Sequence, residues 1–280
     1  MENISKFDPP NFGWLYTKLS KDEINHLWRC IKSSGESNKH VLAGNIASSN
    51  LIEDEGNLFF DNVLSKFIDK YMQEYPIYLD HATRYSYDKV FFDKPLILSS
   101  MWVNRQKQHE FNPLHDHLGL FSFVVWMKIP TNWRDQKEIP FAKESNSPES
   151  ISNFSFTYTN ILGEVNDHNI PMSSEAEGGI VFFPSTLKHQ VYPFFNCEEE
   201  RISISGNIGV DSKSPEPISK VEASKDLDIK KESTTTPEWG EWNQVSNSDK
   251  KETPLSWGSN QEKRDNWWDQ SNTEYGIVYH

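Results

Sequence analysis

The chain is poor in cysteine and has no long apolar run. Only Cys30 and Cys197 occur in 280 residues, too few for a disulfide framework, and this favours a reducing compartment. No apolar stretch approaches the roughly 20 residues of a membrane-spanning helix. The first residues also lack a cationic start followed by an apolar segment. The sequence therefore predicts a soluble, cytoplasmic protein that does not enter a membrane.

Positive charge is also scarce. The chain has 28 Lys and Arg residues against 41 Asp and Glu residues, a formal net charge of −13. Because DNA is a dense polyanion, this balance argues against duplex nucleic acid as a partner.

Glycine-rich phosphate loops of the Walker or dinucleotide type are absent. Neither cysteine has a base beside it in the sequence, so we expect no thiol nucleophile.

Two amphipathic helices are predicted ahead of a strand-rich region. Ser20 and Glu23 have the spacing of a capping box, and apolar residues then recur at helical intervals. A second helix is indicated by the apolar period of residues 60–72. Residues 1–19 do not show this helical period and are predicted to be an irregular lead-in. Two helices ahead of many strands suggest helices packed on the outside of a sheet.

From residue 96 the pattern changes to strand period. One strand is predicted over 96–104, and a second, which contains His115 and His117, extends to Ile129. Residues 131–153 are polar and contain prolines, so we expect a mobile loop over one end of a barrel. Short strands without helices between them indicate an all-β core of the double-stranded β-helix (jelly-roll) type with flanking helices. The remaining strands are predicted at residues 154–158, 179–183, 190–195 and 201–210.

After Val210 the chain loses its apolar periodicity. Residues 211–280 are rich in Ser, Lys, Glu, Asp, Asn and Pro, a composition that cannot bury enough surface to offset chain entropy. We therefore expect residues 1–210 to form the jelly-roll domain with its N-terminal helices, and residues 211–280 to be a disordered acidic tail. The tail carries tryptophans in three related stretches, which have the form of a short linear motif for a protein partner or for the core. Drift in an unstructured tail is the alternative. The tryptophans are Trp239, Trp242, Trp257, Trp267 and Trp268.

Three histidines have the spacing of a metal site. In an extended strand, residues i and i+2 point to the same side, so His115 and His117 face one pocket and Asp116 faces the other way. His189 follows a second apolar strand and a turn. Two imidazoles from one strand and one from a distant strand can together hold a metal ion that acts in catalysis.

The order of these elements resembles the iron(II)- and 2-oxoglutarate-dependent oxygenases, most closely the branch found in phages and bacteria. The resemblance covers roughly residues 40–210, and its separate pieces gain specificity from their order and spacing. It implies Fe(II), 2-oxoglutarate as co-substrate, and O₂. The elements that carry it are Trp102-Val-Asn104, His115-Asp-His117, Ser122, Phe183-Pro-Ser185 with His189, and Arg201-Ile-Ser203 followed by Gly-Asn207.

The metal motif departs from the usual pattern of that family. The family has His-x-Asp or His-x-Glu with a distal histidine, whereas His117 stands here in the place of the acid. Either His115, His117 and His189 form the site, or Asp116 reaches the metal through a bulge. Adjacent residues on a strand cannot both face the metal, which favours three histidines. Loss of the carboxylate leaves the site one unit more positive.

Arg201 and Ser203 are the expected co-substrate clamp. Strand alternation places both on the face opposite the neighbouring isoleucines. A guanidinium can bind a carboxylate bidentately, and a hydroxyl adds a third hydrogen bond. The resemblance implies that this pair binds the C5 carboxylate of 2-oxoglutarate, and that Trp102 and Asn104 line the same pocket. Because an unpaired buried guanidinium is costly, we expect Arg201 to be hydrogen-bonded or partly solvated, not packed on apolar groups.

The leading prediction is a 2-oxoglutarate-dependent non-haem iron dioxygenase. It would hydroxylate a C–H bond of an unidentified substrate, with a protein side chain or a small molecule favoured, in the host cytoplasm if a phage encodes it. The alternatives are a structural or virion-associated jelly roll attached through its Trp-rich tail, and a cupin-like metal-binding protein. Retention of both Arg201 and Ser203 favours the enzyme, because a structural barrel needs no carboxylate clamp. His117 in the acid position favours the alternatives.

Overall fold

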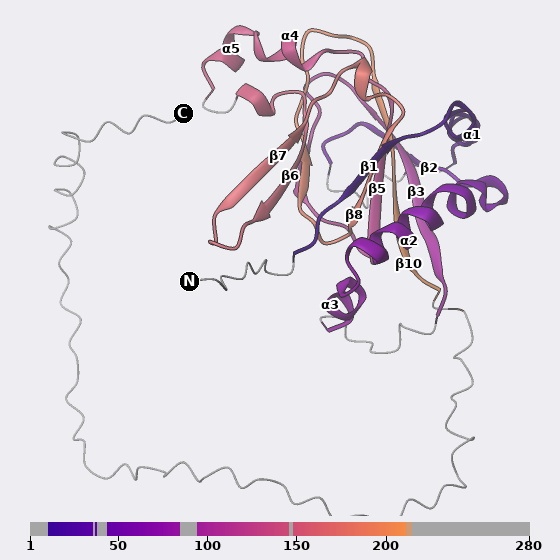
Figure 1. Cartoon of the computed structure of the whole chain (residues 1–280). Helices are drawn as coiled ribbons and strands as arrows, with labels where there is room; N and C mark the ends of the chain where they lie inside the picture. Colours follow the sequence, from indigo (N-terminus) through magenta and orange to yellow (C-terminus); the bar gives the residue numbers. More distant parts are fainter. Residues whose placement is uncertain are drawn as a thin grey trace, which may run out of the picture. The chain divides into compact units, whose positions relative to one another are not determined.

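Two antiparallel sheets pack against each other in the computed structural model (Figure 1). The strands are β1 (Leu15–Lys18), β2 (Ser48–Leu51), β3 (Leu96–Gln106), β4 (Asn112–His115), β5 (Phe121–Lys128), β6 (Phe154–Thr159), β7 (Val165–Ile170), β8 (Gly179–Pro184), β9 (His189–Val191) and β10 (Arg201–Val210). The larger sheet has the order β1-β8-β5-β10-β3-β2, and the smaller sheet has the order β4-β9-β6-β7. From β3 to β10 the chain passes repeatedly between the two sheets, which is the winding of a double-stranded β-helix. The predicted fold class is confirmed.

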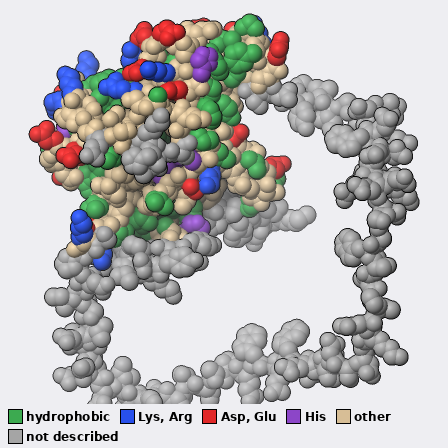
Figure 2. Space-filling view, turned by 180° about the vertical axis from the view of Figure 1, so that it is seen from behind, with side chains coloured by type: hydrophobic (Ala, Val, Ile, Leu, Met, Phe, Trp, Pro, Cys, Tyr) green, Lys and Arg blue, Asp and Glu red, His purple; other side chains and the backbone are tan. Residues whose placement is uncertain are grey.

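The structure describes residues 11–35, 37, 44–84, 94–145, 148–211 and 213, all of which lie in one unit, Met1–Ala223. The predicted disordered tail, residues 211–280, therefore falls outside the described residues except for Asp211 and Lys213. No helix in the described part of the chain combines the length and apolar character needed to cross a membrane. On the face shown in Figure 2, Lys and Arg side chains are interspersed with Asp and Glu.

Three helices cover the outer face of the larger sheet: α1 (Lys21–Lys32), α2 (Ser65–Glu74) and α3 (Tyr78–Arg84) (Figure 1). The capping box at the start of α1 is present: the Glu23 backbone N–H donates to Ser20 Oγ at 3.3 Å, and the Ser20 N–H donates to Glu23 Oε2 at 2.7 Å. A π-helical turn, Phe60–Leu64, leads directly into α2. Both predicted helices are confirmed, because a cap and an apolar stripe are signals within one element.

Strand β5 joins two apolar clusters. Phe123 and Val125 face the helices, whereas Val124 and Trp126 face the smaller sheet. A strand that is buried on both faces must be apolar at every position, and this explains the nearly unbroken apolar run from Phe121 to Met127. The polar face of β10 lies beside β5 between the two sheets, so a cavity with polar walls is enclosed in an apolar core.

The predicted single strand that contains the histidines and extends to Ile129 is wrong. The strand β4 ends at His115 in the smaller sheet, and β5 starts at Phe121 in the larger sheet. Between them, Gly119 has a φ of 98°, and a Cβ atom there would lie 2.7 Å from the carbonyl oxygen of Ile208. Only glycine fits so sharp and so close a turn. The chain therefore crosses from one sheet to the other immediately after His117.

Two further predictions are corrected. Residues 131–153 do not form a loop without secondary structure, because they contain α4 (Trp133–Lys137), α5 (Pro140–Lys143) and a 3₁₀ turn, Pro148–Ser150. Asn132 caps α4 and Pro140 opens α5, signals that are easily overlooked in helices this short. The lead-in is not wholly irregular either, because β1 pairs with β8 along its length. The sequence pattern of β1 is too short to be recognised as a strand from its own residues. The patterns of β2 and α3 are also too short.

Candidate active site

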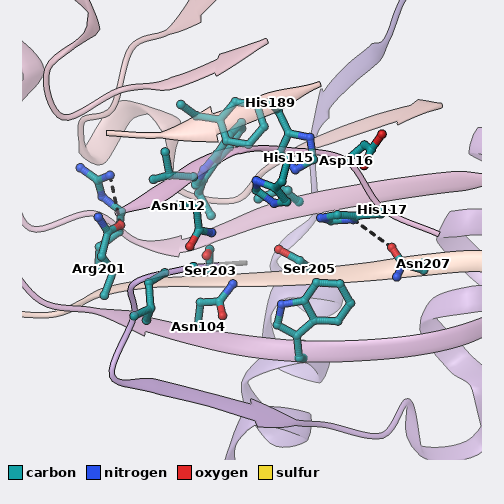
Figure 3. Close-up of a pocket in the computed structure, with 18 of the residues that line it drawn as sticks. Asn104, Asn112, His115, Asp116, His117, His189, Arg201, Ser203, Ser205 and Asn207 are labelled. Carbon is teal, nitrogen blue, oxygen red and sulfur yellow. Dashed lines mark hydrogen bonds between the residues drawn. The ribbon is translucent and has the colours of Figure 1, made fainter. Parts of the chain in front are cut away.

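Three imidazole rings converge between the sheets (Figure 3). His115 is the last residue of β4 and lies directly opposite His189, the first residue of β9, in the ladder that joins these strands. The ring centroids of these two residues are 4.3 Å apart, and the His117 ring lies 5.2 Å from His115 and 4.8 Å from His189. One nitrogen from each ring falls within a group whose members are all within 4.8 Å of one another. The topology thus brings together two histidines that are 74 positions apart (189 − 115).

In each of the three rings, Nδ1 lies within hydrogen-bond distance of a carbonyl oxygen. The Nδ1 atom of His115 lies 2.6 Å from the Pro113 carbonyl oxygen, and that of His189 lies 2.9 Å from the Leu187 carbonyl oxygen. Nδ1 of His117 lies 2.9 Å from Asn207 Oδ1. A carbonyl oxygen can only accept, so each Nδ1 must carry the proton. Each Nε2 is left with a lone pair, which is the form in which imidazole binds a metal.

Burial keeps these imidazoles neutral. Loss of hydration lowers the pKa of His117 from 6.5 to about 4, and the nearby His115 contributes to this decrease. Burial likewise lowers the pKa of His115, and burial together with the two neighbouring imidazoles holds the pKa of His189 well below its usual value. No proton has to be displaced from Nε2 when a metal binds near neutral pH.

Asp116, the alternative ligand, lies at the edge of this arrangement. Its side chain is exposed, and its Oδ2 atom accepts a hydrogen bond from Lys188 Nζ at 2.7 Å. The carboxylate does not belong to the group of atoms formed by the three histidines. In Figure 3 it points away from the His189 ring.

Arg201 lies at the opposite end of the same cavity. Its side chain is only 2% exposed, and its Nη2 atom donates to the Ser152 carbonyl oxygen at 2.7 Å and to Ser152 Oγ at 2.8 Å. Nη1 is 3.4 Å from Gln106 Oε1, whereas Nε is buried without a partner among the described residues. Burial lowers the pKa of Arg201 to about 9. A buried cation with an unused donor is suited to bind an anion.

The expectation for the surroundings of Arg201 is right in part. The guanidinium is hydrogen-bonded, but it is not solvated, and its carbon atom lies 4.9 Å from the centre of the Phe194 ring. This packing on an apolar group differs from the expectation. An aromatic face attracts a cation through its quadrupole, so Phe194 partly offsets the lost hydration.

A single cavity of about 360 Å³ is lined by all the predicted site residues: Trp102, Asn104, His115, Asp116, His117, His189, Arg201 and Ser203. Asn112 also lines it, and its buried Oδ1 atom has no partner in the described part of the chain. Prediction from the sequence missed Gln106, Asn112, Ser152 and the contact that Asn207 makes. Alternation along β3 after Trp102 and Asn104 could have indicated Gln106, but Ser152 has no local signal.

A second group of possible ligands is formed by His26, Cys30 and Asp54. His26 Nε2 lies 2.8 Å from Asp54 Oδ1 and 3.5 Å from Cys30 Sγ, so the thiol has a neighbouring base, contrary to the expectation from the sequence. The Asp54 carboxylate also accepts the backbone N–H groups of Phe59 and Phe60. Burial raises the pKa of Cys30. These contacts satisfy the group internally, and it connects α1 to the start of the next helix.

Residues 100–207 match the model of a family described as "Putative 2OG-Fe(II) oxygenase", and this range contains every predicted site residue. Similar solved structures include a prolyl-4-hydroxylase from Pseudomonas putida, with 12% identity, 71% of this chain and 93% of that chain covered, and a TM-score of 0.40. An oxidoreductase of the 2OG-Fe(II) oxygenase family from Burkholderia pseudomallei has 12% identity, coverage of 70% and 84%, and a TM-score of 0.42. HygX from Streptomyces hygroscopicus, with nickel, 2-oxoglutarate and hygromycin B bound, has 10% identity, coverage of 72% and 84%, and a TM-score of 0.41. No curated protein matches the chain.

Proposed function

The protein is an iron(II)- and 2-oxoglutarate-dependent oxygenase, and we propose that His115, His117 and His189 hold its iron. The donor set fits this metal, because three neutral imidazoles each bring one ligand nitrogen into a group whose members lie within 4.8 Å of one another, and imidazole is a usual ligand of iron. Asp116 has a different role in this proposal. Its ion pair with Lys188 holds the turn between the two histidines at the rim of the site.

Arg201 and Ser203 bind the far carboxylate of 2-oxoglutarate in this proposal. The single observation that carries it is the buried guanidinium, whose Nε donor is unused and which lines the same cavity as the three histidines. Ser203 lies two residues further along the same face of β10, where its hydroxyl adds a donor. Asn104 lies opposite Ser203 on β3, and Trp102 packs near the His117 ring, so both form the wall along which the co-substrate lies.

Iron(II), 2-oxoglutarate and O₂ together supply the oxidising power that hydroxylates a C–H bond, with release of succinate and CO₂. The chain contributes binding, orientation and exclusion of water. Apolar side chains such as Trp126 and Phe154 line the cavity, so charged contacts within it are little screened by solvent. Arg201 would bind one end of a dicarboxylic keto acid, and the imidazoles at the other end of the cavity would hold the iron to which its keto-acid end binds.

The remaining assignments are also proposals. The substrate is a protein side chain or a small molecule, because the net charge of −13 opposes approach to duplex nucleic acid. Residues 1–210 form the catalytic domain, and the Trp-rich stretches of residues 211–280 bind a protein partner. The two free cysteines favour the cytoplasm, which is that of the host if a phage encodes the protein.

The deciding experiment is an anaerobic titration of the full chain with Fe(II) and then with 2-oxoglutarate, followed by the weak visible charge-transfer band of their complex. We expect one Fe(II) per chain and a band that saturates with 2-oxoglutarate. Fe(II) bound without any band would support the cupin-like alternative. Binding of neither would support the structural jelly roll.

A further inference from the structure

Of the three histidines, His117 stands where the resembled oxygenases have a carboxylate ligand. Its Nδ1 atom contacts neither a backbone carbonyl nor an acid. It lies 2.9 Å from Asn207 Oδ1 (Figure 3). It also lies 3.0 Å from Ser122 Oγ. The Ser122 hydroxyl donates to the same Asn207 oxygen at 2.9 Å. One carboxamide oxygen therefore accepts from both the hydroxyl and the imidazole.

The three residues of this hydrogen-bonded group, His117, Ser122 and Asn207, come from three separate segments of the chain. Ser122 on β5 and Asn207 on β10 are directly opposite each other in the antiparallel ladder. The register of β10 against β3 shifts between Asn207 and Ile208, and a bulge of this kind redirects the side chain beside it. The turn that carries His117 lies against the same point, because the Leu120 backbone N–H donates to the Ile208 carbonyl oxygen at 2.8 Å.

Close approach of the turn depends on Gly119. At its φ of 98°, a Cβ atom would lie 2.7 Å from the Ile208 carbonyl oxygen and 3.9 Å from Asn207 Cβ. The His117 backbone N–H is also held, donating to the Ser185 carbonyl oxygen at 2.8 Å. The position of the His117 ring is thus set by backbone contacts on both sides, and its rotation is set by Asn207.

We propose that Asn207, assisted by Ser122, is the positioning residue that makes His117 a metal ligand. It fixes the tautomer with the proton on Nδ1 and turns Nε2 toward His115 and His189. Because a carboxamide is neutral, it does this without adding the negative charge that a carboxylate partner would bring. The net charge of the three-histidine site is therefore left one unit more positive than that of a carboxylate-containing site. This inference rests on the proposed iron site.

Two substitutions separate positioning from simple packing. Asn207→Ala removes the acceptor, whereas Asn207→Asp keeps its shape and adds a negative charge that makes His117 a stronger donor ligand. Ser122→Ala leaves the direct contact between Asn207 and His117 in place. Asn166→Ala is the matched control, because this asparagine is half-buried on β7, which does not line the cavity.

Fe(II) affinity is measured anaerobically on the full chain, together with the visible ligand-field spectrum of the Co(II) form. We expect Asn207→Ala to weaken Fe(II) binding by about 10- to 100-fold, the usual effect of losing such a partner. Asn207→Asp is expected to restore binding to the level of the parent or tighter and to shift the Co(II) bands. Ser122→Ala is expected to have a smaller effect than Asn207→Ala, and Asn166→Ala none.

The outcomes that overturn the inference are distinct from those that overturn the proposed function. An Asn207→Ala protein that is folded, as judged by circular dichroism, and binds Fe(II) within twofold of the parent shows that Asn207 does not position the ligand. An Asn207→Asp protein that binds as weakly as Asn207→Ala leads to the same conclusion, because the aspartate keeps the acceptor oxygen on which positioning depends. A parent protein that binds neither Fe(II) nor Co(II) overturns the iron site itself, and this inference with it.

Discussion

Arg201 and Ser152 are joined by two hydrogen bonds, from Nη2 to the carbonyl oxygen at 2.7 Å and to the hydroxyl oxygen at 2.8 Å. Ser152 is fully buried and has a φ of 66°, in the left-handed region that residues other than glycine rarely adopt. Its N–H also donates to the Pro193 carbonyl oxygen at 3.0 Å. A residue in a strained backbone conformation thus holds the guanidinium of Arg201 through two hydrogen bonds.

The first prediction concerns that strain. Ser152→Ala removes a hydrogen bond to a charged group and is expected to lower the free energy of unfolding by about 1.5–3 kcal/mol. Ser152→Gly loses the same bond but relieves the left-handed backbone, so it should be more stable than the alanine variant by about 1 kcal/mol. Urea unfolding of both variants measures the difference. Equal stability of the two would show that the backbone of Ser152 is not strained.

Arg201 is predicted to govern 2-oxoglutarate binding. A charge-assisted bond contributes about 1.5–3 kcal/mol, so Arg201→Met should weaken 2-oxoglutarate binding by at least about tenfold. Arg201→Lys should recover only part of the loss, because it keeps the charge but not the planar fork. The charge-transfer titration reports the affinity. Fe(II) binding without 2-oxoglutarate is the internal control and should not change, and unchanged 2-oxoglutarate affinity in Arg201→Met would remove the clamp from the proposal.

The metal ligands are predicted to be the three histidines. His115→Ala, His117→Ala and His189→Ala should each abolish stoichiometric Fe(II) binding, because each removes one of three imidazole donors that lie close together. Asp116→Ala should retain it, because that carboxylate pairs with Lys188. Equilibrium dialysis against Fe(II) under argon measures the stoichiometry. Loss of iron in Asp116→Ala together with retention in His117→Ala would reverse the assignment.

Acid is predicted to destabilise the metal-free protein. Burial lowers the pKa of His117 to about 4 from 6.5, so between these values the unfolded chain binds a proton that the folded chain does not. The stabilisation is fully present above about pH 6.5 and is lost as the pH falls toward about 4, an effect of about 3 kcal/mol at about 1.4 kcal/mol per pKa unit. His115 and His189 act in the same direction.

Urea unfolding of the metal-free protein at several pH values between about 7 and about 4 tests this dependence. The other titratable or charged groups around His117 are His115, His189, Asp116 and, next to Asp116, Lys188. His117→Asn removes the titrating group without emptying the site, so its unfolding free energy should fall less steeply with acid. Parallel curves for the parent and this variant would contradict the prediction.

Truncation after Lys213 is predicted to leave the catalytic domain intact. Residues 211–280 lack the apolar periodicity of a core, so the melting temperature and 2-oxoglutarate turnover of the shortened chain should match those of the parent. Differential scanning fluorimetry and succinate release measure the two properties. A truncated chain that fails to fold would show that the tail tryptophans form part of the core.

Much of the fold was determined by local sequence signals. The Ser20 capping box and the apolar stripes produced α1 and α2, because a cap and a helical period act within a few residues. Alternation in β10 placed Arg201 and Ser203 in the cavity and Ile202 and Ile204 in the core, since successive side chains of a strand point to opposite faces. The same rule led to the prediction that His115 and His117 face one site, but β4 ends at His115, so strand alternation is not what brings His117 there.

Only the tertiary structure decided how these parts meet. His117 lies in the turn between the two sheets, not in a strand, and it owes its orientation to Asn207, which is 90 positions away. Ser152 reaches Arg201 across 49 positions. Such contacts depend on which strands become neighbours and on where the chain turns between sheets. Hydrophobic periodicity specifies a buried face but not the partner that the face meets, so the residues that position His117 and Arg201 became visible only in the folded chain.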